Sequence, residues 1–178
     1  MLADVKQGCV VKICMACMTK KEIHFTVEVY PSQDELQPAD AALLAHARAL
    51  TATAYAPYSK FMVSAAAALA NGQQVTGTNQ ENASYPVGLC AERVLLSSAA
   101  TLHPGVGIHS MAITYHNLNG ESNNPISPCG MCRQTLVEYE ERTHQSIRLI
   151  LSGMQGEVFI VQSARQLLPL SFTSGDLK

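Results

Sequence analysis

The order of helical and strand-like stretches is the feature of this sequence that most limits how it can fold. Apolar residues at helical spacing alternate along the chain with short β-branched and apolar runs. The predicted helices cover residues 38–55, 91–102 and 130–142, with a short helical turn at 164–168, and the predicted strands cover 23–30, 62–69, 74–78, 110–115, 146–151 and 157–161. This order predicts an α/β fold, in a three-layer α/β/α arrangement with a mixed central sheet.

A hairpin signal and the chain length refine this expectation. The dipeptide Asn71-Gly72 lies between two predicted strands, and because Asn-Gly favours the tight turns of hairpins, strands 62–69 and 74–78 should pair antiparallel. A chain of 178 residues is enough for one ordinary domain and short for two. We expect a single domain over 21–178, preceded by a poorly ordered N-terminal extension over 1–20.

Composition and charge exclude several classes of protein. Apolar residues make up 47% of the chain and charged residues 15%, which is typical of a globular protein. The formal net charge of −2 disfavours DNA or RNA as a partner, because nucleic-acid binders carry a basic excess.

No apolar run approaches the roughly 20 residues of a membrane helix, so no membrane partner is expected. Cysteines that are kept as metal-binding thiolates need a reducing compartment, which favours a cytoplasmic location.

Cysteines at the starts of two predicted helices indicate a metal site. Cys129 and Cys132 have the CxxC spacing that lets two sulfurs from one turn hold a single tetrahedral ion. Cys90, at the start of the preceding helix, would supply a third thiolate and leave one position open. Three protein ligands and an open position are typical of catalytic zinc, and thiolates favour zinc over harder cations. The sequence therefore predicts one Zn²⁺ per chain.

The residues after Cys90 fit a catalytic site. Glu92 lies two positions from a ligand, so its carboxylate can reach the open position and move a proton between water and substrate. Three thiolates leave the site negatively charged, and the helix N-termini offset part of that charge. Arg93 can also donate hydrogen bonds to the sulfurs from outside the coordination shell.

Several motifs make the chain resemble the small, homotetrameric, zinc-dependent cytidine deaminases. The zinc deaminase signature combines a ligand-x-Glu segment with a later P-C-x-x-C and allows an all-cysteine site. The matching segments lie between about residues 55 and 177 and are 58–63 (YSKFMV), 79–85 (NQENASY), 90–93 (CAER), 127–134 (SPCGMCRQ) and 167–169 (LLP). Together these segments are far more specific than any one of them.

The resemblance implies an activity. It implies a cytidine deaminase-like catalytic domain that converts cytidine and 2′-deoxycytidine to uridine and 2′-deoxyuridine plus ammonia, as part of pyrimidine salvage. Water activated by the metal would add to C4 of the cytosine ring while Glu92 protonates N3. Glu92 would then deliver a proton to the departing amine.

The resemblance also implies substrate contacts and an assembly. Asn79 and Glu81 match a pair that holds the ribose 3′-hydroxyl, Phe61 matches an aromatic residue beside the base, and the backbone N–H of Ala91 would meet the pyrimidine carbonyl. Phe172 matches a C-terminal aromatic that reaches into the site of a neighbouring subunit. Each active site of the implied homotetramer would then be completed by another chain.

Other interpretations of these residues stand beside the catalytic one. The cysteines could form a structural zinc site, but such sites use four ligands and no fourth lies at a suitable spacing from Cys90. Without the resemblance, Asn79 and Glu81 are best interpreted as polar residues that cap a strand end. Phe61 and Phe172 could both be ordinary core aromatics.

Other functions also remain as alternatives. The chain could deaminate a modified pyrimidine or an aminonucleoside antibiotic, whereas a nucleotide substrate would need a cationic phosphate pocket that the site loops do not supply. A non-enzymatic, zinc-stabilised interaction module would have no use for Glu92. Cys9, Cys14 and Cys17 could form a second metal or redox site, although an unstructured extension is the favoured interpretation. Ser64 departs from the family pattern, which has glycine there. Tyr85 is followed by Pro86 and then Gly88, where glycine usually comes directly after the tyrosine, and this changes the loop that approaches the metal and bears on substrate choice.

Overall fold

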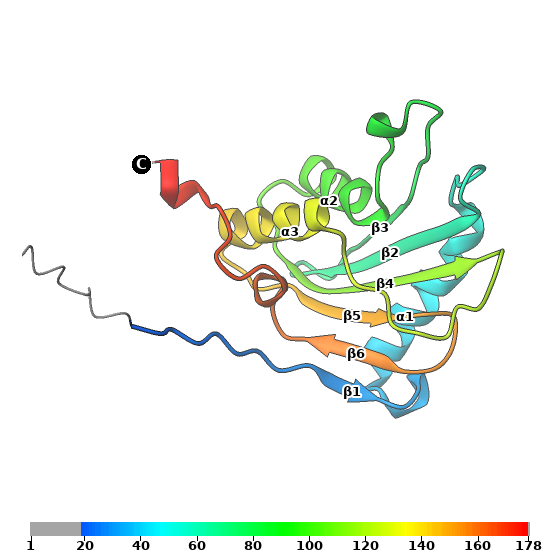
Figure 1. Ribbon diagram of the computed structural model, residues 1–178, viewed down its shortest axis with the longest axis horizontal. Helices are drawn as coiled ribbons and strands as arrows, with labels where there is room; N and C mark the ends of the chain where they lie inside the picture. The colour runs from blue at the N-terminus through cyan, green and yellow to red at the C-terminus, as the bar shows by residue number, and fades with distance from the viewer. Residues whose placement is uncertain (1–18, 178) are drawn as a thin grey trace, which may run out of the picture.

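A six-stranded mixed sheet forms the centre of the computed structural model, which describes residues 19–177 (Figure 1). The predictions for Cys9, Cys14 and Cys17 lie outside these residues. The strand order is β1-β6-β5-β4-β2-β3, and all neighbours are antiparallel except the parallel pair β4 and β5. The strands are β1 Glu28–Tyr30, β2 Phe61–Leu69, β3 Gln74–Thr78, β4 Ile108–Asn117, β5 Arg148–Ser152 and β6 Val158–Val161.

Three helices cover the two faces of this sheet and complete the predicted three layers. Helix α1 (Pro38–Leu50) lies on one face, and α2 (Ala91–Leu102) and α3 (Gly130–Thr143) lie on the other (Figure 1). In β2, the strand next to the edge strand β3, Ala65 and Ala67 pack in the core beneath α2 and α3, while Ala66 packs in the core beneath α1. Successive side chains of a strand point to opposite faces, so this run of alanines lets helices approach the sheet closely from both sides.

The expected elements are present, and two of them, the first strand and the first helix, are much shorter than predicted. Strand β3 and helix α2 have the predicted bounds. The strand expected over 23–30 is paired only at Glu28–Tyr30, because its partner β6 is four residues long. The helix expected over 38–55 ends at Leu50 and continues as a 3₁₀ turn, Thr51–Thr53, in which both threonine hydroxyls donate to backbone carbonyls three residues earlier. Such bonds compete with continued α-helix.

Ser64 keeps the regular register of β2. It pairs with Thr78 of β3 and Thr114 of β4 without a bulge. The side chain is fully buried, and its hydroxyl donates a 2.5 Å hydrogen bond to the carbonyl of Ala47 in α1. A buried hydroxyl is costly when it has no partner; here α1 supplies one, so the serine joins the helix to the sheet.

A glycine sets how closely α2 approaches the sheet. A Cβ built at Gly77 in β3 would lie 2.4 Å from the carbonyl oxygen of Ala91 and 2.5 Å from the backbone nitrogen of Leu95. Both atoms belong to the first turns of α2. The start of α2 directly follows Cys90. Only glycine in β3 allows this helix start to pack against the strand at this distance.

None of the helices in the described part of the chain is long and apolar enough to cross a membrane.

We predict that Gly77→Ala lowers the free energy of unfolding. The added methyl group meets backbone rather than a movable side chain, so α2 must shift, at a cost of about 1–3 kcal/mol. Urea unfolding measures the loss. The same change at Gly130, where an added Cβ meets no atom within 4 Å, is the matched control and should leave stability unchanged or slightly higher. Equal stability of the Gly77→Ala chain and wild type would show that the close approach is not required.

Candidate metal centre and active site

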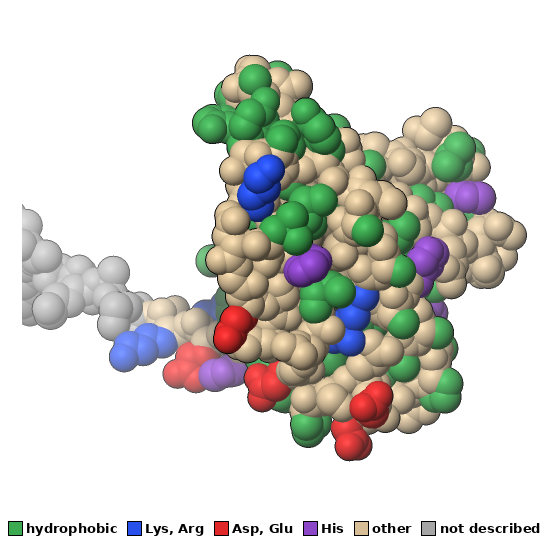
Figure 2. Space-filling view, turned by 90° about the vertical axis from the view of Figure 1, so that its right-hand side faces the viewer, with side chains coloured by type: hydrophobic (Ala, Val, Ile, Leu, Met, Phe, Trp, Pro, Cys, Tyr) green, Lys and Arg blue, Asp and Glu red, His purple; other side chains and the backbone are tan. Residues whose placement is uncertain are grey.

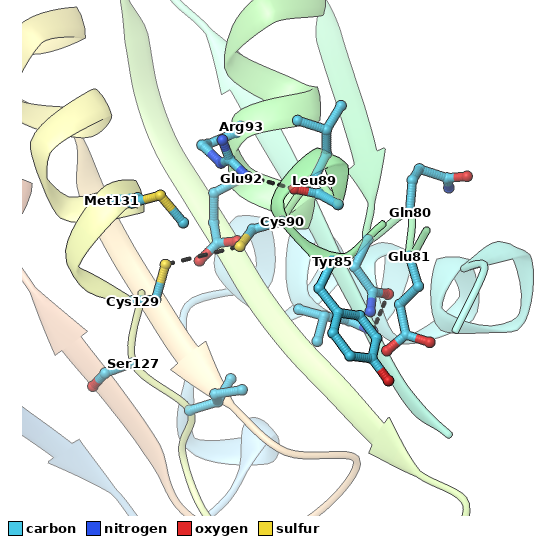
Figure 3. A pocket seen from close by; sticks show the side chains of 14 residues that line it. Gln80, Glu81, Tyr85, Leu89, Cys90, Glu92, Arg93, Ser127, Cys129 and Met131 are labelled. Atoms are coloured by element: carbon cyan, nitrogen blue, oxygen red, sulfur yellow. Dashed lines mark hydrogen bonds between the residues drawn. The ribbon is translucent and has the colours of Figure 1, made fainter. Parts of the chain in front are cut away.

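Two helix starts bring three cysteine sulfurs together. Cys90 is the N-cap residue of α2, Cys129 is the N-cap residue of α3, and Cys132 lies in the first turn of α3. All three sulfurs lie within 4.8 Å of one another. The Sγ atoms of Cys90 and Cys129 are 3.8 Å apart (Figure 3). Those of Cys129 and Cys132 are 3.5 Å apart. The sulfurs are therefore placed to share one ion.

These distances fit zinc. Thiolates bound to zinc at about 2.3 Å in a tetrahedron lie about 3.8 Å from one another. The two measured sulfur–sulfur distances of 3.8 and 3.5 Å are close to that edge. Within residues 19–177 the metal-ligating group contains these three cysteines and no fourth residue. The donor set thus matches a three-cysteine zinc site with one open position, as the sequence predicted.

Arg93 supplies positive charge next to the sulfurs. Its Nη2 atom donates to the Gly88 carbonyl at 2.8 Å, while its Nε is buried without a hydrogen-bond partner in the described chain. The pKa of Cys90 is lowered to about 5, first by a hydrogen bond with Cys132, then by one with Cys129 and by the charge of Arg93. The pKa of Cys132 is raised, first by the same hydrogen bond with Cys90 and then by burial. In a metal site with three thiolates, the positive charge of Arg93 and its unbonded Nε–H group would stabilise the negative charge on the sulfurs.

A buried carboxyl group lies beside the sulfurs. The side chain of Glu92 is only 4% exposed, although glutamate is an ionisable residue. Burial raises the pKa of its carboxyl group, and the neighbouring Cys90 raises it further. Figure 3 shows this carboxyl group pointing from α2 into the space between Cys90 and Cys129. An acidic group held there can exchange protons with a molecule at the open metal position.

Cys90, Cys129 and Glu92 form part of the wall of a cavity of about 370 Å³. The size suits a small molecule rather than a polymer. Of the residues predicted from sequence, the cavity is lined by Asn79, Glu81, Cys90, Glu92, Arg93 and Cys129. Cys132 is fully buried behind it.

Asn79 and Glu81 are both held by backbone groups. The side-chain oxygen of Asn79 accepts from Val63 N–H at 2.8 Å, and its amide nitrogen donates to the Phe61 carbonyl at 2.9 Å. One Glu81 oxygen accepts from Tyr58 N–H at 2.8 Å. Burial would raise the pKa of Glu81, but hydrogen bonds from the Ser59 hydroxyl and from the loop backbone lower it below its usual value. Asn79 therefore extends the β2–β3 pairing, and the hydrogen bonds to Glu81 favour its carboxylate form.

Phe61, Ala91 and Phe172 are not among the residues that line the cavity. The Phe61 ring stacks on Tyr115 with centroids 4.6 Å apart. The Ala91 side chain is fully buried, and its N–H is the first of α2, where helix N–H groups have no partner within the helix. Phe172 is 59% exposed on the C-terminal segment. The predicted roles of these three residues remain predictions.

The cavity has further lining residues, several of them apolar, and three belong to the 85–89 loop that the sequence predicted to approach the metal. Its remaining lining residues are Val63, Gln80, Tyr85, Gly88, Leu89, Ile126, Ser127 and Met131. Met131 lies between two of the cysteines, so the CxxC motif could have indicated it. Tyr85 and Val87 are largely exposed in the loop that follows β3, and Figure 2 shows hydrophobic side chains gathered on the part of the surface that projects at the top. Nothing in the pattern around Ile126 points to a site.

Comparisons with known proteins agree on one family. Residues 38–146 match the family model described as the cytidine and deoxycytidylate deaminase zinc-binding region. A cytidine deaminase of Halalkalibacterium halodurans is 33% identical over 124 residues, which are 70% of this chain and 86% of that protein. A cytidine deaminase of Mycoplasma genitalium is 44% identical over 96 residues, which are 54% of this chain and 67% of that protein. The crystal structure of cytidine deaminase from Burkholderia pseudomallei has a TM-score of 0.65 and 38% identity, covering 77% of this chain and all of that one.

We predict that Cys129→Ser and Cys132→Ser each lose the metal. A serine hydroxyl is a poor substitute for a thiolate, and two remaining sulfurs cannot complete the site. The measurement is zinc per chain by mass spectrometry, with about one ion expected for the wild type. A chain in which Cys9, Cys14 and Cys17 are all changed to serine is the control and should keep its zinc. A full equivalent of zinc in Cys132→Ser would contradict the assignment.

Proposed function

The chain belongs to the cytidine and deoxycytidylate deaminase zinc-binding family, and from that premise we propose that it hydrolyses cytidine and 2′-deoxycytidine to uridine and 2′-deoxyuridine plus ammonia. The observation that carries the proposal is the position of the buried Glu92 carboxyl beside three sulfurs that leave one metal position open. A site built only to stabilise the fold would be closed by a fourth ligand.

We assign the metal to Cys90, Cys129 and Cys132 and proton transfer to Glu92. Zinc bound at these sulfurs would supply an acidified water molecule as the nucleophile for C4 of the cytosine ring. Glu92 would take a proton from the attacking water and pass it to N3 of the ring. It would then move the proton of the new C4 hydroxyl group to the amine as the bond between C4 and the amine nitrogen breaks, which leaves the C4 carbonyl of the product. Because Glu92 is shielded from bulk water, its protons go to the substrate rather than to solvent.

The contacts around the cavity support a nucleoside as the substrate. The two backbone N–H groups that bond Glu81 meet the same carboxylate oxygen, so the other oxygen can accept from a ribose 3′-hydroxyl. Asn79, next to it, is held rigid by β2. The N–H of Ala91, at the start of α2, is free to donate to the pyrimidine carbonyl, and Phe61 would lie beside the base.

The charges of the cavity favour a nucleoside over a nucleotide. Among the described residues that line the cavity, Arg93 is the one with a cationic side chain, and it is already bonded to the Gly88 carbonyl. Glu81 and Glu92 are both acidic. A phosphate group would therefore meet carboxylates without a cationic partner, which disfavours cytidine monophosphate as a substrate.

We predict that Glu92→Gln retains zinc and the fold but loses turnover. Glutamine keeps the size of the side chain and cannot shuttle a proton, so kcat for cytidine should fall by at least about 10²–10⁴-fold. Ultraviolet-monitored conversion of cytidine to uridine measures the rate, with zinc counted on the same sample. Glu138→Gln, an exposed position on α3, is the matched control. Full activity of Glu92→Gln would overturn the mechanism, and zinc without conversion in the wild type would redirect the search to modified pyrimidine nucleosides.

The same proposal includes a homotetramer with shared sites, in the cytoplasm, serving pyrimidine salvage. Three thiolates at one metal suit a reducing compartment. Exposed apolar side chains at the cavity, Tyr85, Leu89 and Met131, are a surface that a neighbouring chain would cover. Phe172 is exposed and outside the cavity of its own chain, so it is available to a neighbouring site.

We predict that light scattering gives a particle of four times the 19.1 kDa chain mass. If sites are shared, Phe172→Ala chains, which keep Glu92, regain activity when they are mixed and reassembled with inactive Glu92→Gln chains, which keep Phe172. As the control, the Phe172→Ala chains are mixed with chains that carry both changes. These chains can donate neither Phe172 nor Glu92, so the mixture should show no gain in activity. A monomeric particle, or equal activity in both mixtures, would contradict shared sites.

A further inference from the structure

Arg133, the residue after Cys132, joins two distant parts of the chain at the metal centre. Its Nε donates to the Pro128 carbonyl at 2.8 Å, and its Nη1 donates to the Leu167 carbonyl at 3.0 Å. Both acceptors are neutral, and within residues 19–177 no carboxylate lies within 4.0 Å of this guanidinium group. The side chain therefore contacts backbone on two sides, one of which directly precedes the ligand Cys129.

Cys129 depends on its backbone for its orientation. It is exposed, it precedes the first residue of α3, and its side chain makes no capping hydrogen bond. Cys132, by contrast, is fully buried inside the first turn. The Pro128 carbonyl belongs to the same peptide plane as the Cys129 nitrogen. A hydrogen bond that fixes this carbonyl also fixes the direction in which the Cys129 sulfur leaves the chain.

The other ligand-bearing helix start has a similar arrangement. Cys90 is the N-cap residue of α2, and Arg93 from the first turn of α2 donates to the Gly88 carbonyl in the preceding loop. In both helices an arginine of the first turn reaches back to the loop that leads into an N-cap cysteine. Arg93 also faces the sulfurs, whereas Arg133 reaches away from them to Leu167.

Leu167 is a firm anchor because the 3₁₀ turn Ala164–Leu167 is itself held by α3. The buried Glu140 carboxylate accepts hydrogen bonds from the N–H groups of Ala164 and Arg165, at 2.9 and 3.2 Å. Glu140 and Arg133 thus bind the beginning and the end of this turn to the same helix. In Figure 1 the C-terminal segment lies beside α3.

We propose that Arg133 is a positioning residue for the metal: it holds the Cys129 ligand in place by bonding the Pro128 carbonyl to the C-terminal turn at Leu167. The inference rests on the proposed zinc site at the three cysteines. Its consequence is that the C-terminal turn, far from the cysteines in sequence, contributes to metal retention. A cavity of about 350 Å³ borders Arg133, so shorter side chains fit there without a clash.

The test is the rate at which the zinc-loaded full-length chain releases zinc to a chromogenic chelator. Glutamine at this position cannot bridge both carbonyls, and loss of such a supporting bond typically costs about 10–100-fold in metal affinity. We expect Arg133→Gln to release zinc at least about 10-fold faster than the wild type. Arg133→Lys, whose ammonium can reach one carbonyl but lacks the planar fork, should fall between the two.

Two controls separate positioning from general stability. Arg142→Gln removes the same charge from an exposed position of the same helix, where the arginine lies over Tyr139, and should release zinc at the wild-type rate. Urea unfolding of the zinc-free chains measures the structural effect alone. If Arg133→Gln lowers zinc-free stability but releases zinc at the wild-type rate, the proposal is wrong. A wild-type chain that binds no zinc would instead contradict the proposed function.

Discussion

Two helices that begin at the same end of one sheet face are the constraint on which the rest of this structure depends. Cys90 precedes α2 and Cys129 precedes α3, and the sulfurs of both lie 3.8 Å apart although 39 positions separate them in the chain. The N–H groups at both helix starts point toward the same region, where they favour negative charge. A thiolate-rich metal site and a cavity for a polar substrate follow from that one placement.

Small residues beneath the helices make the placement stable. The alanines of β2 allow layers on both faces, and Gly77 lets the backbone of α2 lie directly against β3. Larger residues at these positions would lift α2 from the sheet and move Cys90 and Glu92 with it. Close packing in this part of the molecule therefore has a catalytic consequence as well as a stabilising one.

The site concentrates acidic groups and offsets them locally. Three thiols and the carboxyl group of Glu92 share a small volume, and charges of one sign in such a space repel strongly. Arg93 and the helix starts supply the opposing charge, and a divalent ion would supply more. Arg133 adds a mechanical support through neutral carbonyls. Electrostatic and positional support thus come from arginines in the first turns of both helices.

The sequence by itself determined the three cysteines that can hold a metal ion, Glu92 as the candidate proton carrier, the bounds of α2 and β3 and the three layers. Each is carried by local spacing: CxxC within one turn, a carboxylate two residues from a cysteine, and periodicity within one element. Only the tertiary structure decided that β1 is short, that Ile126 lines the cavity, and that Arg133 meets Leu167. These features depend on where segments far apart in the chain come to lie side by side. Such contacts cannot be predicted from local sequence patterns, because they depend on how the layers pack.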